Sequence, residues 1–115
     1  MRQVVLRTGE FSTEGEAIAL AEAEGLIPHA FDLEPSGIDH WHDFGAKVFV
    51  VDGSVKITDV ESGSSYELTA GCSIRADPGA VHREEGDPYR AVVAFDCDPA
   101  TLTMPIDKSP ADRPA

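Results

Sequence analysis

The feature that most constrains the fold of this chain is a succession of short apolar runs, each closed by a turn signal. From residue 28 onward these runs have the length and the residue pattern of β-strands. The sequence Asp52-Gly53 between two such runs is typical of a tight hairpin turn. Short strands at such close spacing predict an antiparallel sandwich or barrel. The expected strands are 28–33, 38–43, 46–52, 54–60, 64–69, 72–76, 80–85 and 89–96.

The residues before this region predict one more strand and a single helix. Residues 3–7 have the composition of a short strand. Thr13 and Glu16 have the spacing of a capping box, which marks the start of a helix. Apolar side chains then recur at helical spacing, at Ala17, Ile18 and Ala21. Because Gly25 is a typical helix stop, we expect one helix at about 14–24.

The length of 115 residues indicates one domain. We place that domain at 1–98, with the barrel at about 28–96 and the N-terminal strand and helix within 1–25. Beyond Asp98 the composition shifts to Pro, Asp, Ala and Lys, which predicts an extended C-terminal tail over 99–115.

Charge and hydropathy exclude several classes of partner. Nine Lys and Arg stand against 21 Asp and Glu, for a net charge of -12. A surface so acidic does not suit nucleic acid or an anionic membrane. The sequence contains no apolar stretch of membrane-spanning length and no signal-peptide pattern. Cys72 and Cys97 do not form a disulfide framework, so we expect reduced thiols in a cytoplasmic protein.

Two of the four histidines have the spacing of metal ligands. His40 and His42 lie two residues apart, so on a strand their imidazoles share one face. Neutral imidazole suits Zn, Cu, Fe and Ni. A bare pair of this kind is also compatible with an exposed strand. His29 has no partner at ligand spacing and is interpreted as structural.

The sequence around these histidines resembles the cupin superfamily. Its first motif reads G-x5-H-x-H-x3/4-E-x6-G, and its second reads G-x5-P-x-G-x2-H-x3-N. The resemblance covers about residues 28–96 and implies an all-β fold, a cupin-type antiparallel β-barrel (jelly roll), here with one short N-terminal helix. It also implies that three histidines bind one divalent transition metal, with Fe, Ni, Mn and Zn as candidates. The matching positions are His40, His42 and Gly53 in the first motif, and Gly71, Gly79 and His82 in the second.

The chain departs from the family pattern at several positions. Ala46 stands where the family has its metal-binding Glu. In the second motif Pro78 comes one place late and Gly86 replaces Asn, and in the first motif Glu34 replaces the leading Gly. The expected site is therefore of the three-histidine type, a class that includes diketone-cleaving dioxygenases. Ala46 also leaves space beside the metal.

Two carboxylates are candidates for the missing ligand. Glu84 lies two residues after His82 and therefore shares its face of a strand. A carboxylate inside an apolar barrel needs a partner, so Glu84 is expected to be a fourth ligand or a general base. A rim ion pair with Arg75 or Arg90 is the alternative. Asp43 follows His42 directly and should point away from the metal.

The inward side chains of the strands predict a small, mainly apolar pocket. Its expected lining is Ala46, Val48, Val50, Ile57 and Ile74. Arg75 or Arg90 could bind a carboxylate or enolate there, although each is also a typical surface residue.

The outward side chains Trp41, Phe49 and Val51 form a face too apolar for water. The helix at 14–24, the tail or a second subunit could cover it. Small cupins are often dimers, so a homodimer that uses this face is expected.

Three functions fit these observations. The first is a mononuclear metal enzyme, dioxygenase-like or isomerase/cyclase-like. The resemblance implies a small oxygenated substrate for it, such as a diketone, a thiol acid or an aromatic polyketide. The second is a non-catalytic small-molecule-binding or sensor module, and the third is a metal-free isomerase that uses His82 and Glu84. Whether the chain is an enzyme stays open at this point; if it is one, it is expected to be a metal-dependent oxidoreductase.

Overall fold

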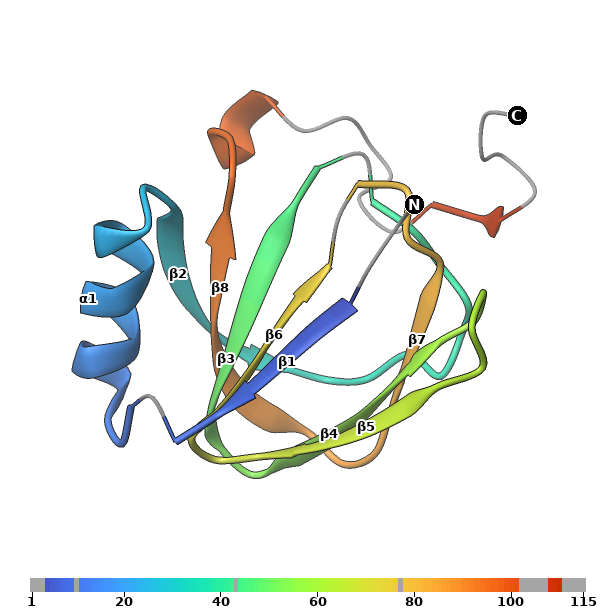
Figure 1. Ribbon diagram of the computed structural model, residues 1–115, viewed down its shortest axis with the longest axis horizontal. Coiled ribbons are helices and arrows are strands. Elements are labelled where there is room, and N and C mark those ends of the chain that lie inside the picture. Colours follow the sequence, from blue (N-terminus) through green and yellow to red (C-terminus); the bar gives the residue numbers. More distant parts are fainter. Residues whose placement is uncertain (1–3, 10, 43, 77, 102–107, 111–115) are drawn as a thin grey trace.

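The computed structural model describes residues 4–9, 11–42, 44–76, 78–101 and 108–110 (Figure 1). Within this part of the chain, strands predominate and one α-helix precedes most of them. The elements are β1 (Val4–Thr8), α1 (Glu14–Ala23), β2 (Ile27–Leu33), β3 (Ala46–Asp52), β4 (Ser54–Asp59), β5 (Ser65–Thr69), β6 (Cys72–Ala76), β7 (His82–Glu85), β8 (Tyr89–Phe95) and the 3-10 helix η1 (Pro99–Thr101).

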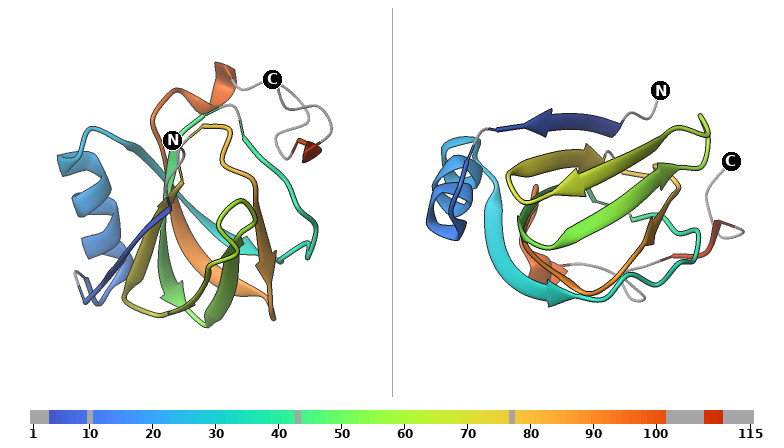
Figure 2. Two further views of the ribbon diagram at one scale, coloured as in Figure 1. Left: turned by 45° about the vertical axis from the view of Figure 1, so that its right-hand side comes forward. Right: turned by 90° about the horizontal axis from the view of Figure 1, so that it is seen from below.

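The strands form two antiparallel sheets. One sheet has the order β1-β6-β3-β8-β2 and the other has the order β5-β4-β7. Every hydrogen-bonded pair of neighbours is antiparallel. Both sheets curve around a common interior, with α1 outside it (Figure 2). This jelly-roll sandwich confirms the all-β fold with one short N-terminal helix.

One expected strand, 38–43, is wrong. Its described residues form only two isolated bridges, His40 with His82 and Trp41 with Lys108. The segment follows β7 through backbone hydrogen bonds at Gly37 and His40 alone, three residues apart. It then turns to a different partner at Trp41, so no continuous ladder forms. The other expected strands match observed ones, although β7 begins two residues later than expected.

Helix α1 begins at the expected capping box and covers the outer face of the five-stranded sheet (Figure 1). The backbone N–H of Glu16 donates to the Thr13 hydroxyl at 3.1 Å, and the Thr13 N–H donates to the Glu16 carboxylate at 3.1 Å. The buried face of the helix packs on the sheet through Ala17 and Ala21. Among the described residues, no helix is long and apolar enough to cross a membrane.

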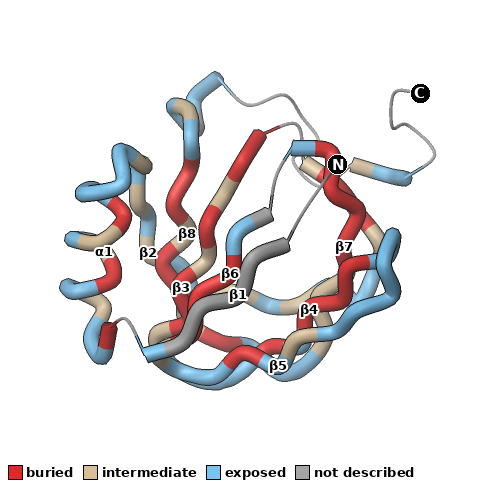
Figure 3. The backbone as a smooth tube through the Cα atoms, in the orientation of Figure 1, coloured by how far each residue is buried: buried red, intermediate tan, exposed pale blue. Residues whose placement is uncertain are grey.

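The interior between the sheets is divided along the strands. On β3, Val50 is fully buried in the inner apolar core, whereas Ala46 and Val48 line a cavity. Buried residues recur along β3, β4 and β8, while β5 is largely exposed (Figure 3). The other buried members of the inner core are Val55, Ile57, Leu68, Cys72, Ile74, Tyr89 and Ala91. One end of the sandwich is therefore filled, and the other end is left for a site.

The apolar outer face expected from Trp41, Phe49 and Val51 is covered by the chain itself. Phe49 and Val51 pack in the outer cluster with α1. Trp41 is 7% exposed, and its indole Nε1–H donates to the Ser109 carbonyl at 2.7 Å. Helix α1 and the C-terminal segment therefore cover this outer face together. The homodimer stays a prediction, and this face no longer argues for it.

The C-terminal tail expected over 99–115 is described only in part. Pro99–Thr101 form η1, and Lys108 pairs with Trp41 through two backbone hydrogen bonds of 3.0 and 2.9 Å. The remainder of the tail, 102–107 and 111–115, lies outside the described residues.

Candidate metal centre

The three histidines of the two motifs converge at the open end of the sandwich. His40 and His82 exchange two backbone hydrogen bonds of 2.9 Å, which sets their rings side by side with centroids 4.4 Å apart. The ring of His42 lies 5.1 Å from that of His40 and 5.0 Å from that of His82. One nitrogen from each ring lies within 4.8 Å of the other two. These donor atoms are close enough to be drawn onto one ion.

Backbone carbonyls fix the orientation of two of these rings. His40 Nδ1 lies 2.8 Å from the Ile38 carbonyl oxygen, and His82 Nδ1 lies 2.9 Å from that of Ala80. A carbonyl only accepts hydrogen bonds, so each Nδ1 must carry the proton. In the neutral imidazole the Nε2 atom then holds the lone pair. Metal-ligating histidines are commonly oriented by such a bond from the second nitrogen. The two rings therefore fit a metal site.

A backbone contact joins the two motif segments at His42. The Gly79 N–H donates to the His42 carbonyl at 2.8 Å. Gly79 has a φ of 80°, a left-handed conformation that is strained for a residue with a side chain. Phe44 stacks on the His42 ring at 4.9 Å and 22°. The third imidazole is thus placed by a glycine turn and by an aromatic neighbour.

Glu84 is the carboxylate that the structure brings to the histidines. Its Oε1 lies 3.8 Å from His40 Nε2 and 3.7 Å from His82 Nε2. The side chain is 23% exposed, whereas those of His40 and His82 are 7% and 6% exposed. The oxygen therefore lies at nearly equal distances from the two Nε2 atoms. A cation between them would be held by imidazole and carboxylate together.

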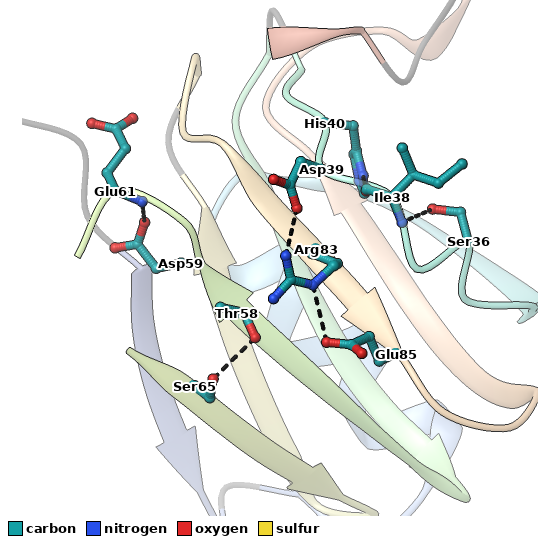
Figure 4. Close-up of polar contacts among 10 residues, drawn as sticks. All are labelled: Ser36, Ile38, Asp39, His40, Thr58, Asp59, Glu61, Ser65, Arg83 and Glu85. Atoms are coloured by element: carbon teal, nitrogen blue, oxygen red, sulfur yellow. Dashed lines mark hydrogen bonds and ion pairs between the residues drawn. The ribbon is translucent and has the colours of Figure 1, made fainter. Parts of the chain in front are cut away.

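The neighbours of Glu84 on β7 point to the opposite face. The Arg83 guanidinium donates to Asp39 at 2.8 Å and to Glu85 at 3.0 Å (Figure 4). The hydrogen bonds that Arg83 donates to the Glu85 and Asp39 carboxylates raise the pKa of the guanidinium, which stays charged. This ion pair ties the residue before His40 to the strand that carries His82. It therefore supports the site from the side away from the histidines.

The histidines and Glu84 stand at the polar end of a cavity of about 300 Å³. The remaining walls are mostly aromatic and aliphatic. This make-up is typical of a small-molecule site. The lining residues are Phe31, Leu33, Glu34, Ser36, His40, His42, Phe44, Ala46, Val48, Ile57, Ile74, His82, Glu84, Tyr89, Val93 and Phe95.

The expected pocket residues separate into two groups. Ala46, Val48 and Ile74 line the cavity. Val50 packs in the core, and Arg75 is exposed on the outer face, opposite Lys47 in the register. Arg75 follows Ile74 on β6, so alternation turns it away from the cavity, and it is not among the described lining residues.

The other candidate residues do not join the metal centre. Arg90 donates to Glu14 at 2.7 Å and to Asp32 at 3.1 Å, which matches the alternative of a typical surface residue. His29 is exposed, with its ring near Phe31 and Phe95. Asp43 lies outside the described residues.

The sequence analysis missed the aromatic part of the lining. Phe31 on β2, Tyr89 and Phe95 on β8, and Phe44 before β3 all face the cavity. Alternation along β2 and β8 is the signal that could have identified Phe31, Tyr89 and Phe95. Each of them lies an even number of residues from another lining residue of its own strand, Leu33 on β2 and Val93 on β8. Burial, and secondarily the charge of Glu84, raise the pKa of Tyr89 above its usual value near 10.0. Its hydroxyl is therefore a hydrogen-bond donor at neutral pH.

Comparisons with known proteins agree with this geometry. A family model described as a cupin domain matches residues 29–93, which is more than half of the chain. A crystal structure of a DUF861 family protein from Thermotoga maritima has a similar fold, with a TM-score of 0.59 and 19% sequence identity. That match covers 81% of this chain and 99% of the other. A search of curated proteins gives no match.

Proposed function

Since the chain belongs to the cupin family, we propose that it holds one divalent transition metal through His40, His42 and His82. The observation that carries this proposal is the approach of three imidazole nitrogens to within 4.8 Å at the end of a cavity. The carbonyl contacts of His40 and His82 support it, because they turn both Nε2 lone pairs to the same place. Fe, Ni, Mn and Zn all suit such ligands.

We further propose Glu84 as the fourth ligand. The family places its carboxylate on the strand where this chain has Ala46, and a carboxylate from another position would restore that ligand. Glu84 lies within 4 Å of two histidine nitrogens and is mostly buried. Burial of a carboxylate is costly unless a cation or donor faces it, which supports a metal partner. The role of general base toward a bound ligand is the alternative for the same side chain.

The site is proposed to be catalytic, with a dioxygenase-like or isomerase/cyclase-like reaction on a small organic molecule. A bound metal with few protein ligands supplies Lewis acidity and, if it is redox-active, oxygen chemistry. The chain's own residues contribute the cavity that holds the molecule and excludes water. A non-catalytic small-molecule-binding or sensor module is the second candidate, favoured by the largely apolar walls. Turnover that requires added metal separates the first candidate from the second, and turnover that survives chelation would favour metal-free acid–base catalysis.

Metal titrations of matched glutamate variants test the ligand set. We expect Glu84→Gln to weaken metal binding at least about tenfold, because an amide carries no charge to offset that of the ion. Glu85→Gln is the control, since Glu85 is the next residue on β7 and pairs with Arg83 on the other face. Isothermal titration of each chelator-treated protein with Zn(II) gives the dissociation constants. Equal constants for Glu84→Gln and Glu85→Gln would exclude Glu84 as a ligand.

Two further expectations belong to this proposal. A homodimer is supported by the fact that small cupins are often dimers. A sedimentation mass of one chain at micromolar concentration would contradict it. A cytoplasmic location is supported by the unpaired state of Cys72 and Cys97.

A further inference from the structure

We propose that the ligand of this cavity is an uncharged, aromatic-sized molecule, and not a carboxylate. The proposal deepens the function above, because it names the class of molecule for the same site. It is carried by the charges and the shape of the cavity wall. It narrows the range of substrates that the family resemblance allows, since it disfavours the acids among them.

The described cations lie away from the cavity. Among the Lys and Arg side chains that the structure describes, none lines it. Lys47 is 5% exposed, but it lies on the outer face, where it donates to Glu24 at 3.0 Å. Arg83 and Arg90 each pair with two carboxylates outside the cavity. A ligand carboxylate would therefore meet no basic side chain in the described part of the wall.

The charged groups that do line the cavity are acidic. Glu84 lies among the histidines, and Glu34 lies on the segment after β2. With the charge of -12 on the whole chain, these carboxylates oppose a second anion. A divalent ion would set two positive charges against these two carboxylates, so the wall as a whole would still offer an anion no excess of positive charge. The electrostatics of the wall thus favour a neutral molecule.

The shape and the surface of the walls favour a ring. Four aromatic side chains line the cavity: Phe31, Phe44, Tyr89 and Phe95. Phe31 is 41% exposed although it belongs to the lining, so a ligand against it would bury apolar surface that now faces solvent. The volume of about 300 Å³ is at the lower end of the range for small-molecule pockets. A compact, uncharged aromatic molecule fits these limits.

A matched set of probes tests the proposal on the wild-type protein. Acetophenone and benzoate share a ring and a similar shape but differ in charge, and glucose is neutral but polar. The chelator-treated protein is titrated with each probe and followed by methyl shifts in NMR spectra. We expect acetophenone to bind about tenfold more tightly than benzoate, and to shift the methyls of Val48, Ile57 and Val93. The methyls of Ile18 and Val51, which lie in the outer cluster, should not move.

Removal of the wall charge at Glu34 provides the matched variant. Glu34→Gln should strengthen benzoate binding severalfold and leave acetophenone unchanged, whereas Glu67→Gln, an exposed change on β5, should alter neither. Benzoate binding as tight as that of acetophenone, or glucose binding in place of both, would overturn the proposal. Because these titrations use metal-free protein, their failure is distinct from a failure to bind metal.

Discussion

At the scale of single residues, the main proposal is that Glu84 takes the place of the carboxylate ligand that the family has at the position of Ala46. Ala46 leaves a gap where the family has a carboxylate, and Glu84 brings a carboxylate to the same histidines from β7. The two positions lie on different sheets but line one cavity. A carboxylate at either position would thus supply the same charge to the same ion.

Exchange of the two positions should therefore restore binding. We expect the double variant Ala46→Glu, Glu84→Gln to regain most of the Zn(II) affinity that Glu84→Gln alone loses. The physical reason is that the charge returns to the cavity, although from the opposite sheet. Isothermal titration of both variants measures the recovery. If the double variant binds as weakly as Glu84→Gln, the two positions are not equivalent.

Tyr89 gives a second prediction at this scale, on the pH dependence of stability. Burial raises the pKa of its phenol in the folded protein, so above pH 10 the folded state holds a proton that the unfolded state loses. The free energy of unfolding should be unaffected by this group below pH 10. It should fall above that pH by up to about 1.4 kcal/mol per pH unit. Urea unfolding of wild type and Tyr89→Phe between pH 9 and pH 11 measures the difference, and parallel losses in the two proteins would refute the assignment.

At the scale of elements, the segment that carries His40 and His42 is held from both sides. On one side it pairs with β7 at His40, and on the other Trp41 bonds to Lys108 and Ser109. The segment itself is not a strand, so these contacts take the place of a sheet ladder. The C-terminal segment therefore contributes to the position of His40 and His42, two of the proposed metal ligands.

Removal of the C-terminal segment should loosen the site. We expect deletion of residues 102–115 to shift the emission of Trp41, the sole tryptophan, to longer wavelength because its indole loses cover. Zn(II) affinity should fall about fivefold, equivalent to the loss of roughly one hydrogen bond. Deletion of 111–115 alone keeps Lys108 and Ser109 and is the control. Unchanged emission and affinity in the longer deletion would show that the segment does not position the histidines.

The elements also show what could be predicted from the sequence. Alternation and turn residues identified most strands and the capping box identified the helix, because these signals are local. The prediction of a strand over 38–43 failed, because the partners of this segment lie at His82 and Lys108, far along the chain. Alternation counted from Ile74 on β6 would have turned Arg75 outward. Alternation along β8 would have brought Tyr89 and Phe95 into the cavity. The Nδ1 contacts that orient His40 and His82 depend on atomic positions that no spacing reveals.

At the scale of the whole molecule, charge and packing divide the chain into three parts. Basic groups pair with acids on the outer surface, for example Lys47 with Glu24 and Arg90 with Glu14. The apolar core fills one end of the sandwich. The other end holds the cavity, where the histidines are its expected centre of positive charge once a metal is bound. This division leaves one end of an acidic protein for a site whose walls are mostly apolar.

The metal content of the purified protein tests this account most directly. We predict close to one divalent transition metal per chain, and its loss in the double variant His40→Ala, His42→Ala. Elemental analysis of both proteins, after incubation with Fe(II), Ni(II), Mn(II) and Zn(II) in turn, gives the stoichiometry. Wild-type protein that stays metal-free with all four ions, or that keeps its metal in the double variant, would contradict the account.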